Sequence, residues 1–211
     1  MNSTAQALIE SGRVTDPNSP RGRLLAQAAH LFKTRGYERT TVRDLAAAVG
    51  IQSGSIFHHF RTKEDILYAI MEETIHYITA RMKAALAEAG DPAAQVRALI
   101  RCELESIHGE TSEAMTVLVY EWRSLSEARQ ARILKMRDEY EQLWLDALSA
   151  AREAGYLDAD VWVLRRFLTG ALSWTVFWYK PGGSMSLDDL ADQALKMVIP
   201  SASAGGQHAL L

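Results

Sequence analysis

The sequence predicts an all-helical fold, on the strength of three observations. Apolar residues recur at helical spacing along most of the 211 residues, and no segment sustains the alternation typical of a strand. Only five prolines occur, and Pro17, Pro20 and Pro200 lie near the ends, so few residues interrupt helices in the interior. Hydrophobic residues make up 48% of the chain, which allows a sizeable core. We expect about nine helices and no sheet.

The first helices are expected to be short. An apolar stripe within residues 24–32 predicts a helix that Gly36 ends. The next helix begins with the capping-box pattern Thr41-Val42-Arg43-Asp44 and ends at Gly50, which can adopt a left-handed turn at little steric cost. A third short helix is expected over residues 53–60, with Ser53 as its cap.

Longer helices follow. Thr62-Lys63-Glu64-Asp65 opens one whose apolar residues recur every three or four positions as far as Leu86. Asp91-Pro92 is an N-cap followed by proline at the first helical position. Four more helices are expected: one from Ser112, and others over about residues 126–154, 158–179 and 186–199, the last two capped by Asp158 and Ser186. The polar residues 1–20 indicate a flexible arm, and residues 200–211 a frayed tail.

Charge is distributed unevenly along the chain. The net charge is −3, but residues 21–63 hold eight basic and two acidic side chains, which leaves −9 for the rest. A compact basic segment attached to an acidic body favours binding of a polyanion. A solvated charged surface is the alternative, and charge alone does not separate the two.

Residues 36–63 have the pattern of a helix-turn-helix. Two short helices meet at a tight turn around Gly50, and a small core is expected from Leu45, Ala46, Val49, Ile51 and Ile56. In such a motif the start of the second helix faces base edges in the major groove, where Gln52 can pair with adenine and Gly54 permits close approach. Arg43 can reach a base or a phosphate. The expected DNA contacts are Thr40, Thr41, Arg43, Gln52, Ser53, Gly54, Ser55, Phe57, His58 and Lys63.

The stretch LFKTRGYERTTVRDLAAAVGIQSGSIFHHFRTKEDIL closely resembles the DNA-binding half of the TetR family of transcriptional regulators. The resemblance implies an all-helical homodimer, with a three-helix DNA-binding domain and a six-helix domain that binds an effector and dimerises. It places the DNA-binding domain at residues 21–66 and the effector-binding domain at residues 67–199. The family usually has tyrosine at the position of Phe57, whose hydroxyl often touches a phosphate, so Phe57 departs from the pattern. Phe60 is assigned to the core.

The body is rich in aromatic residues and contains all five tryptophans. Residues 171–179 are apolar on nearly all sides, so we expect them to be covered by the core and by a twin subunit. Ligand pockets are mostly apolar, which makes some of these side chains candidates for an effector site. The candidates are Met115, Tyr120, Trp122, Trp144, Trp174 and Trp178. Ordinary core packing is the alternative for each.

A second stretch, ALSWTVFWYKPGGSMSLDDLAD, resembles the C-terminal segment of TetR-family regulators of fatty-acid and steroid breakdown. Several of those respond to acyl-CoA thioesters. The resemblance implies an effector whose acyl chain occupies the aromatic cavity. Candidate partners of the CoA phosphates are Arg123, Arg165, Arg166 and Lys180.

Taken together, the sequence predicts a sequence-specific transcriptional regulator, more often a repressor in this family, that binds a palindromic operator and releases it on binding a small hydrophobic effector. Half-sites about one helical turn (~34–36 Å) apart match a dimer. An enzyme and an architectural DNA-binding protein without effector remain the alternatives. The chain lacks a Gly-rich phosphate loop and a Gly-x-Ser-x-Gly motif, and His58 and His59 would point about 100° apart on a helix. We expect no catalytic residue, cofactor or metal site.

The expected location is the cytoplasm, away from any membrane. The single cysteine, Cys102, rules out an intramolecular disulfide and is expected to be buried. The first ten residues lack the pattern of a secretion signal. The most apolar stretch, residues 167–179, is too short to span a bilayer.

Overall fold

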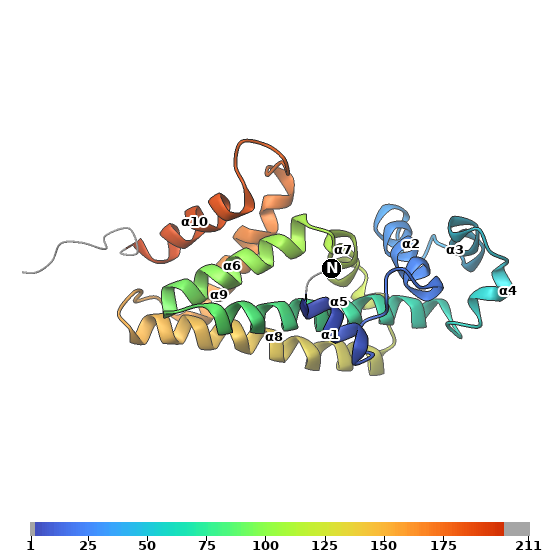
Figure 1. Cartoon of the computed structure of the whole chain (residues 1–211), viewed down its shortest axis with the longest axis horizontal. Helices are drawn as coiled ribbons and strands as arrows, with labels where there is room; N and C mark the ends of the chain where they lie inside the picture. Colours follow the sequence, from blue (N-terminus) through green and yellow to red (C-terminus); the bar gives the residue numbers. More distant parts are fainter. Residues whose placement is uncertain (1–2, 201–211) are drawn as a thin grey trace, which may run out of the picture. The chain divides into compact units, whose positions relative to one another are not determined.

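The computed structural model describes residues 3–200 (Figure 1). Within that range it contains ten α-helices, two short 3-10 helices and no strand, so the all-helical prediction is confirmed. The chain forms two compact units. Within the described residues, the first consists of residues 3–80 and 110–139, and the second of residues 81–109 and 140–200.

The first unit contains the short N-terminal helices and the segment around α7. Its elements are α1 (Ser3–Glu10), α2 (Pro20–Arg35), α3 (Val42–Val49), α4 (Ser53–Ile56), α5 (Lys63–Glu88) as far as Ala80, α7 (Ser112–Tyr120), the 3-10 helix η1 (Trp122–Ser124) and the start of α8 (Glu127–Glu153).

Helices α2 and α3 end at the glycines that the sequence predicts, and α3 begins at its predicted capping box. Gly36 ends α2 with φ 86°, and its N–H donates to the carbonyl of Phe32. Thr41 and Asp44 form the capping box of α3, in which each side chain accepts the other residue's N–H. Gly50 ends α3 in the left-handed conformation, with φ 71°. These local signals are therefore sufficient to fix α2 and α3 in the sequence.

The prediction for the third short helix is wrong in its span and its cap: α4 covers only Ser53–Ile56, and its N-cap is Gln52 and not Ser53. The three N–H groups that follow Ile56 donate to carbonyls three residues back, so the chain continues there as turns.

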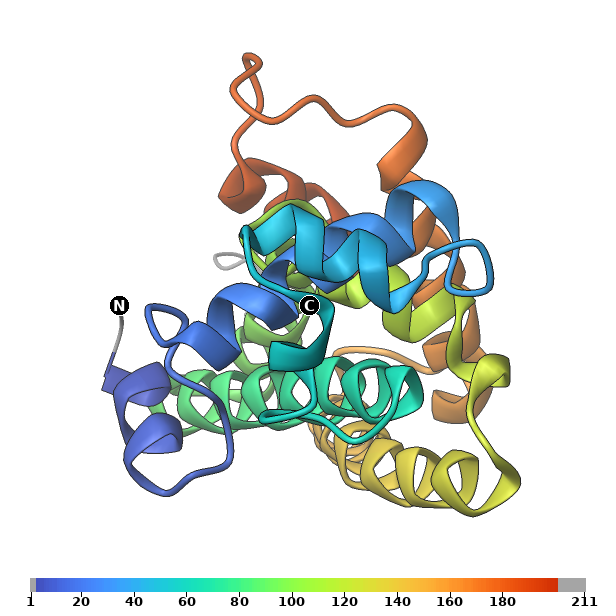
Figure 2. The same cartoon turned by 90° about the vertical axis from the view of Figure 1, so that its right-hand side faces the viewer.

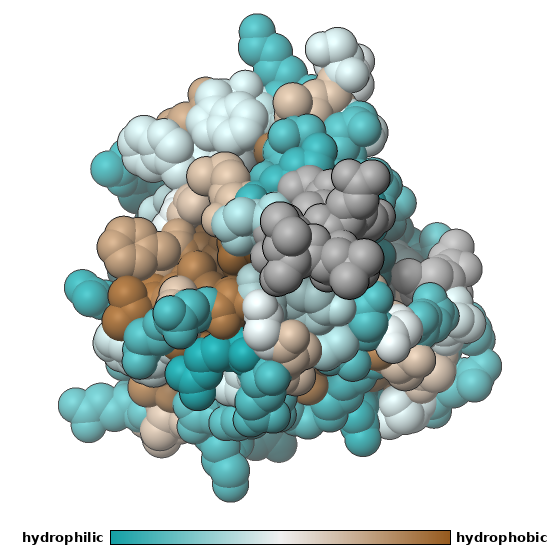
Figure 3. Space-filling model, turned by 90° about the vertical axis from the view of Figure 1, so that its left-hand side faces the viewer, coloured by the Kyte–Doolittle hydropathy of each residue, from teal (hydrophilic) through white to brown (hydrophobic). Residues whose placement is uncertain are grey.

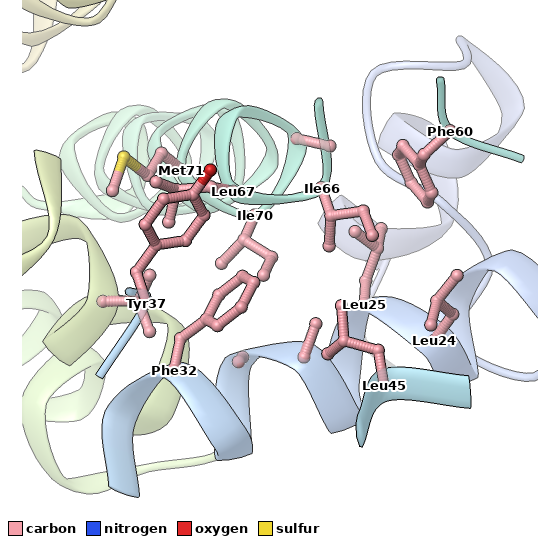
Figure 4. Close-up of a cluster of buried hydrophobic side chains, with 14 of the residues drawn as sticks. Leu24, Leu25, Phe32, Tyr37, Leu45, Phe60, Ile66, Leu67, Ile70 and Met71 are labelled. Carbon is pink, nitrogen blue, oxygen red and sulfur yellow. The ribbon is translucent and has the colours of Figure 1, made fainter. Parts of the chain in front are cut away.

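The core of the first unit lies between α2, α3 and the first half of α5 (Figure 4). Phe32 and Leu45 are fully or almost fully buried, and the rings of Phe32 and Tyr37 meet edge to face at 5.2 Å. Burying one such side chain contributes about 2 kcal/mol, compared with about 1 kcal/mol for a typical helix cap. Phe60 is buried as expected, but Ile51 is 39% exposed and lies outside this core. Ile51 directly follows the left-handed turn at Gly50, which directs the chain away from the core.

The N-terminal residues differ from the flexible arm expected from their polar composition. Ser3–Glu10 forms α1, and Leu8 on it is buried. The backbone N–H of Thr15 donates to Glu73 of α5 at 2.9 Å, and Arg21 pairs with the same carboxylate at 2.9 Å. The polar side chains of this segment therefore bind a partner that lies 58 residues away in sequence, which local composition does not reveal.

The second unit is built from the end of α5, α6 (Pro92–His108), the remainder of α8, α9 (Val161–Trp174), the 3-10 helix η2 (Thr175–Phe177) and α10 (Leu187–Val198). The predicted cap at Asp91 with Pro92 and the capping box of Ser186 and Asp189 are present. Helix α9, however, is capped by Asp160, whose carboxylate accepts from Val163 N–H at 2.9 Å, and not by Asp158. It ends at Trp174, where the hydroxyl of the buried Thr175 donates to Leu172 O and a 3-10 turn follows.

A buried ionic cluster ties α6, α8 and α9 together inside the second unit. Arg165 is 2% exposed and lies 3.3 Å from a carboxylate oxygen of Glu103 and 3.1 Å from one of Glu141. The hydroxyl of Tyr140 donates to Glu103 at 2.7 Å, and the guanidinium of Arg165 stacks over Trp144. Burying charges is costly unless they are paired, so these partners explain why Arg165 is tolerated in the core.

The surface of the second unit exposes several large apolar side chains. On the face shown in Figure 3, hydrophobic residues gather in one patch among hydrophilic ones. From α9 to α10, the large apolar side chains that are more than half exposed are Trp162, Phe167, Trp174, Val176, Phe177, Trp178 and Met197. Cys102, in contrast, is buried as predicted, and burial raises the pKa of its thiol.

Candidate nucleic-acid interface

Helices α3 and α4 form a helix-turn-helix (Figure 2). The exposed residues of this motif include polar and basic side chains. The N–H of Ile51 donates to the carbonyl of Ala46 at 3.0 Å, which closes the turn after Gly50. Ile56 of α4 is 1% exposed and packs in the core with Leu45. The inner faces of both helices are thus fixed by apolar contacts, and the outer faces are presented to solvent.

Most of the predicted DNA contacts lie on this outer surface. The exposed ones are Thr41, Arg43, Gln52, Gly54, Phe57 and His58, and Ser53 and Ser55 are half-buried. Gln52 is the N-cap residue of α4, yet its side chain makes no capping bond, so its amide is available to a base. Phe57 is 55% exposed and offers an apolar ring.

The hydroxyl of Thr41 serves the fold as well as the surface. It donates to Asp44 Oδ2 at 2.6 Å and accepts from Asp44 N–H at 3.2 Å. The hydrogen bonds that the hydroxyl and the backbone N–H of Thr41 donate hold the pKa of the Asp44 carboxyl below its usual value. The cap therefore keeps a negative charge beside Arg43, at the start of α3, where the helix dipole favours it.

Thr40 and Lys63 are placed differently from the other predicted contacts. The side chain of Thr40 is fully buried, and its hydroxyl donates to Gly36 O at 2.9 Å. The ammonium of Lys63 donates to the carbonyl oxygens of Tyr37 at 2.8 Å and Thr40 at 3.0 Å. The hydroxyl of Thr40 therefore lies outside the exposed surface of α3 and α4, and the ammonium of Lys63 is bonded to the loop that precedes α3.

The structure divides the six effector candidates between the two units. Met115, Tyr120 and Trp122 belong to the first unit, and Trp144, Trp174 and Trp178 belong to the second. Trp144 is fully buried under Arg165, whereas Tyr120 is 70% and Trp174 63% exposed. A shared role for these six in one ligand site stays a prediction.

Sequence reasoning missed two sets of residues. Glu121 accepts a hydrogen bond from the N–H of Tyr37, and the 84 positions between them hide this contact from any local pattern. Phe167 and Gly170 lie on the same face of α9 as Trp174, because positions three and seven apart share a helix face. That spacing was visible in the sequence, but the exposure of the face was not.

Among residues 3–200, no three His, Cys, Asp or Glu side chains are grouped so that they could hold a metal ion. No helix in the same range combines the length and the apolar character that crossing a membrane requires.

Comparison with known proteins gives a consistent result in both parts of the chain. Residues 24–70 match the family model described as "Bacterial regulatory proteins, tetR family", and residues 89–201 match "Tetracyclin repressor-like, C-terminal domain". The HTH-type transcriptional repressor KstR2 of Rhodococcus jostii is 35% identical over 193 residues, which cover 90% of this chain and 91% of that repressor.

Solved structures agree with the sequence matches. The ketosteroid transcriptional regulator KstR2 of Mycobacterium tuberculosis is 30% identical, with a TM-score of 0.79 over 90% of this chain and 97% of that one. A protein described as superantigen pfit is 58% identical, with a TM-score of 0.83 over 93% and 97% of the two chains. AibR, solved with isovaleryl coenzyme A and operator DNA, is 25% identical, with a TM-score of 0.77 over 86% and 99%.

Proposed function

The chain belongs to the TetR family of bacterial transcriptional regulators, and we propose that it represses transcription from a palindromic operator as a homodimer and is released by an acyl-CoA thioester. That it is a DNA-binding regulator follows from the family. The operator, the dimer surface and the effector are the parts that need testing.

The outer surface of α3 and α4 carries the proposal of specific DNA binding. It combines a cation, an amide and two hydroxyls, from Arg43, Gln52, Ser53 and Ser55, on helices whose inner faces are packed. Such groups can form hydrogen bonds with base edges in the major groove. Residues 21–66 are proposed as the DNA-binding domain and residues 67–199 as the domain that senses and dimerises.

The exposed face of α9 supports the proposal that a second copy of this chain packs against it. Phe167 is 74% exposed and Trp174 63% exposed, and Gly170 lies between them. A Cβ at Gly170 would meet nothing within 4 Å, so the isolated chain gains nothing from this glycine. Glycine inside a helix costs about 1 kcal/mol relative to alanine, and close approach of a partner helix offsets that cost.

The acyl-CoA proposal rests on the aromatic C-terminal segment and on AibR, which was solved with isovaleryl coenzyme A. Of the cations suggested for the CoA phosphates, Arg165 is buried against carboxylates, so we withdraw it. Arg123, Arg166 and Lys180 are exposed and stay candidates.

The other readings of the sequence have less support. The family is one of transcriptional regulators, and the relative KstR2 is a repressor, so an enzyme is not supported. The superantigen description belongs to pfit, and the helix-turn-helix described above supports DNA binding in this chain. An architectural protein without effector is distinguished by the experiment that follows.

The test selects binding sites for the purified protein from a random-oligonucleotide pool and then measures competition at fixed salt. We expect a palindromic sequence bound at least about a thousandfold more tightly than bulk DNA. Isovaleryl coenzyme A should release the operator, and free coenzyme A, as the matched control, should not. If the selection recovers no preferred sequence, the proposal of a sequence-specific regulator is rejected. If both compounds release the operator, or neither does, the proposal of an acyl-CoA effector is rejected.

A further inference from the structure

The loop between α2 and α3 is held by the first residue of α5. The Lys63 ammonium donates to the carbonyl oxygens of Tyr37 and Thr40 at 2.8 and 3.0 Å. It also lies 4.0 Å from the centre of the Tyr37 ring. An ammonium has three donors, so this loop occupies two of them and covers the charge with an aromatic face.

The same loop is held from the end of α7. Glu121 Oε1 accepts the N–H of Tyr37 at 3.2 Å and is the atom nearest to where a Cβ of Gly36 would lie, at 3.7 Å. Tyr37 is thus bound through its carbonyl to α5 and through its N–H to the C-terminal end of α7.

The position of this loop determines where α3 begins. Thr40 closes the loop through its bond to Gly36 O, and the next residue, Thr41, is the N-cap of α3. Helix α4 follows α3 after a single tight turn. Displacing the carbonyls of Tyr37 and Thr40 would therefore displace both helices of the proposed interface.

We propose that Lys63 and Glu121 are positioning residues, which set the orientation of α3 and α4 without contributing a phosphate contact of their own. This rests on the proposed operator binding. It contrasts with the phosphate contact that the position of Lys63 suggests from sequence, because two of the three donors of its ammonium are bonded to the loop.

The variants separate charge from positioning. Lys63→Met keeps the aliphatic stem and removes the donors, whereas Lys63→Arg keeps the charge in a planar group that fits a phosphate at least as well. Glu121→Ala removes a negative charge, which by electrostatics alone would strengthen DNA binding. Glu121→Gln keeps an acceptor oxygen. Arg43→Met is the control for a cation that reaches DNA.

Operator affinity is measured for each variant at several salt concentrations, at a temperature where circular dichroism shows it folded. We expect Lys63→Met and Lys63→Arg each to weaken binding about tenfold, with the salt dependence of the wild type. Arg43→Met should lower the slope of log affinity against log salt by about 0.9. Glu121→Ala should weaken binding, and Glu121→Gln should restore it.

A second duplex, with its half-sites moved apart by one base pair, distinguishes positioning from general destabilisation. The wild type should bind the original spacing much more tightly than the altered one. In Lys63→Met and Glu121→Ala the ratio of these two affinities should be several-fold smaller. An equal loss on both duplexes would reduce these residues to a structural role and overturn the proposal. Should Lys63→Met not fold, Lys63→Arg decides.

Two further results would overturn the proposal. The first is a slope of log affinity against log salt that is lower by about 0.9 in Lys63→Met, combined with wild-type affinity in Lys63→Arg. That combination would identify Lys63 as a phosphate contact. The other is tighter binding by Glu121→Ala. If the wild type selects no sequence, the proposed function fails and the positioning role fails with it. If the wild type does select a sequence, the measurements on the variants test only the positioning role.

Discussion

At position 54 a glycine occupies a place where the fold leaves room for a side chain. A Cβ there would meet nothing within 4 Å, and the backbone is not in the left-handed region. Glycine in a helix is less favourable than alanine by up to about 1 kcal/mol. The isolated fold would thus be more stable with alanine at this position, and the proposed approach of a DNA duplex would account for the glycine.

We therefore predict opposite effects of Gly54→Ala on stability and on binding. The free energy of unfolding should rise by up to about 1 kcal/mol in a urea titration, while operator affinity falls because the methyl group meets the duplex. Gly90→Ala is the matched control, since a Cβ at Gly90 also meets nothing and the residue lies in the loop after α5. Unchanged operator binding by Gly54→Ala would remove the argument for close approach.

Asp44 gives a residue-scale prediction of pH dependence. Hydrogen bonds from Thr41 lower its pKa below the usual 3.8, so the folded state favours the ionised form. Its stabilising contribution is complete above the usual pKa and is lost as the pH falls through the lowered one. Between about pH 5 and pH 3, the urea midpoint of the wild type should fall more than that of Asp44→Asn. Parallel curves would show that the cap does not depend on the charge.

At the scale of elements, the sequence predicts what adjacent residues decide and misses what remote ones decide. The capping box of Thr41 and Asp44 and the cap at Asp91 need only neighbours, so they were predictable. The ordered N-terminal segment, in contrast, is held by the contact of Thr15 with Glu73, 58 residues away. The surface residues of α3 and α4 were found because motif spacing is local, whereas Glu121 was not.

The ionic cluster that joins α6, α8 and α9 gives the prediction at this scale. Arg165→Met leaves Glu103 charged, 3% exposed and without its cation, so unfolding free energy should fall by about 3–5 kcal/mol. Adding Glu103→Leu should recover much of that loss, because a buried pair replaced by apolar groups is often neutral. Chemical denaturation of the single and double variants measures both values. If the double variant has a lower free energy of unfolding than Arg165→Met, packing and not charge pairing determines the stability of this cluster.

At the scale of the whole molecule, the proposed dimer predicts that operator binding requires the exposed face of α9. Phe167→Glu introduces a charge at the centre of that face, which a closely packed interface cannot accommodate. Light scattering at micromolar concentration should show a monomer, and operator affinity should fall steeply, because one half-site remains. Met197→Glu, on an 82% exposed residue of α10, should leave the mass unchanged. A dimeric Phe167→Glu would assign the interface to another surface.

Cys102 has a practical consequence that concerns labelling chemistry. It is the single cysteine of the chain, and its burial and raised pKa keep it largely protonated and out of reach of thiol reagents. A cysteine introduced on the exposed side of α2, such as Gln27→Cys, would then react almost alone. One spin label per subunit would let pulsed resonance spectroscopy follow the span between the two labels as acyl-CoA is titrated.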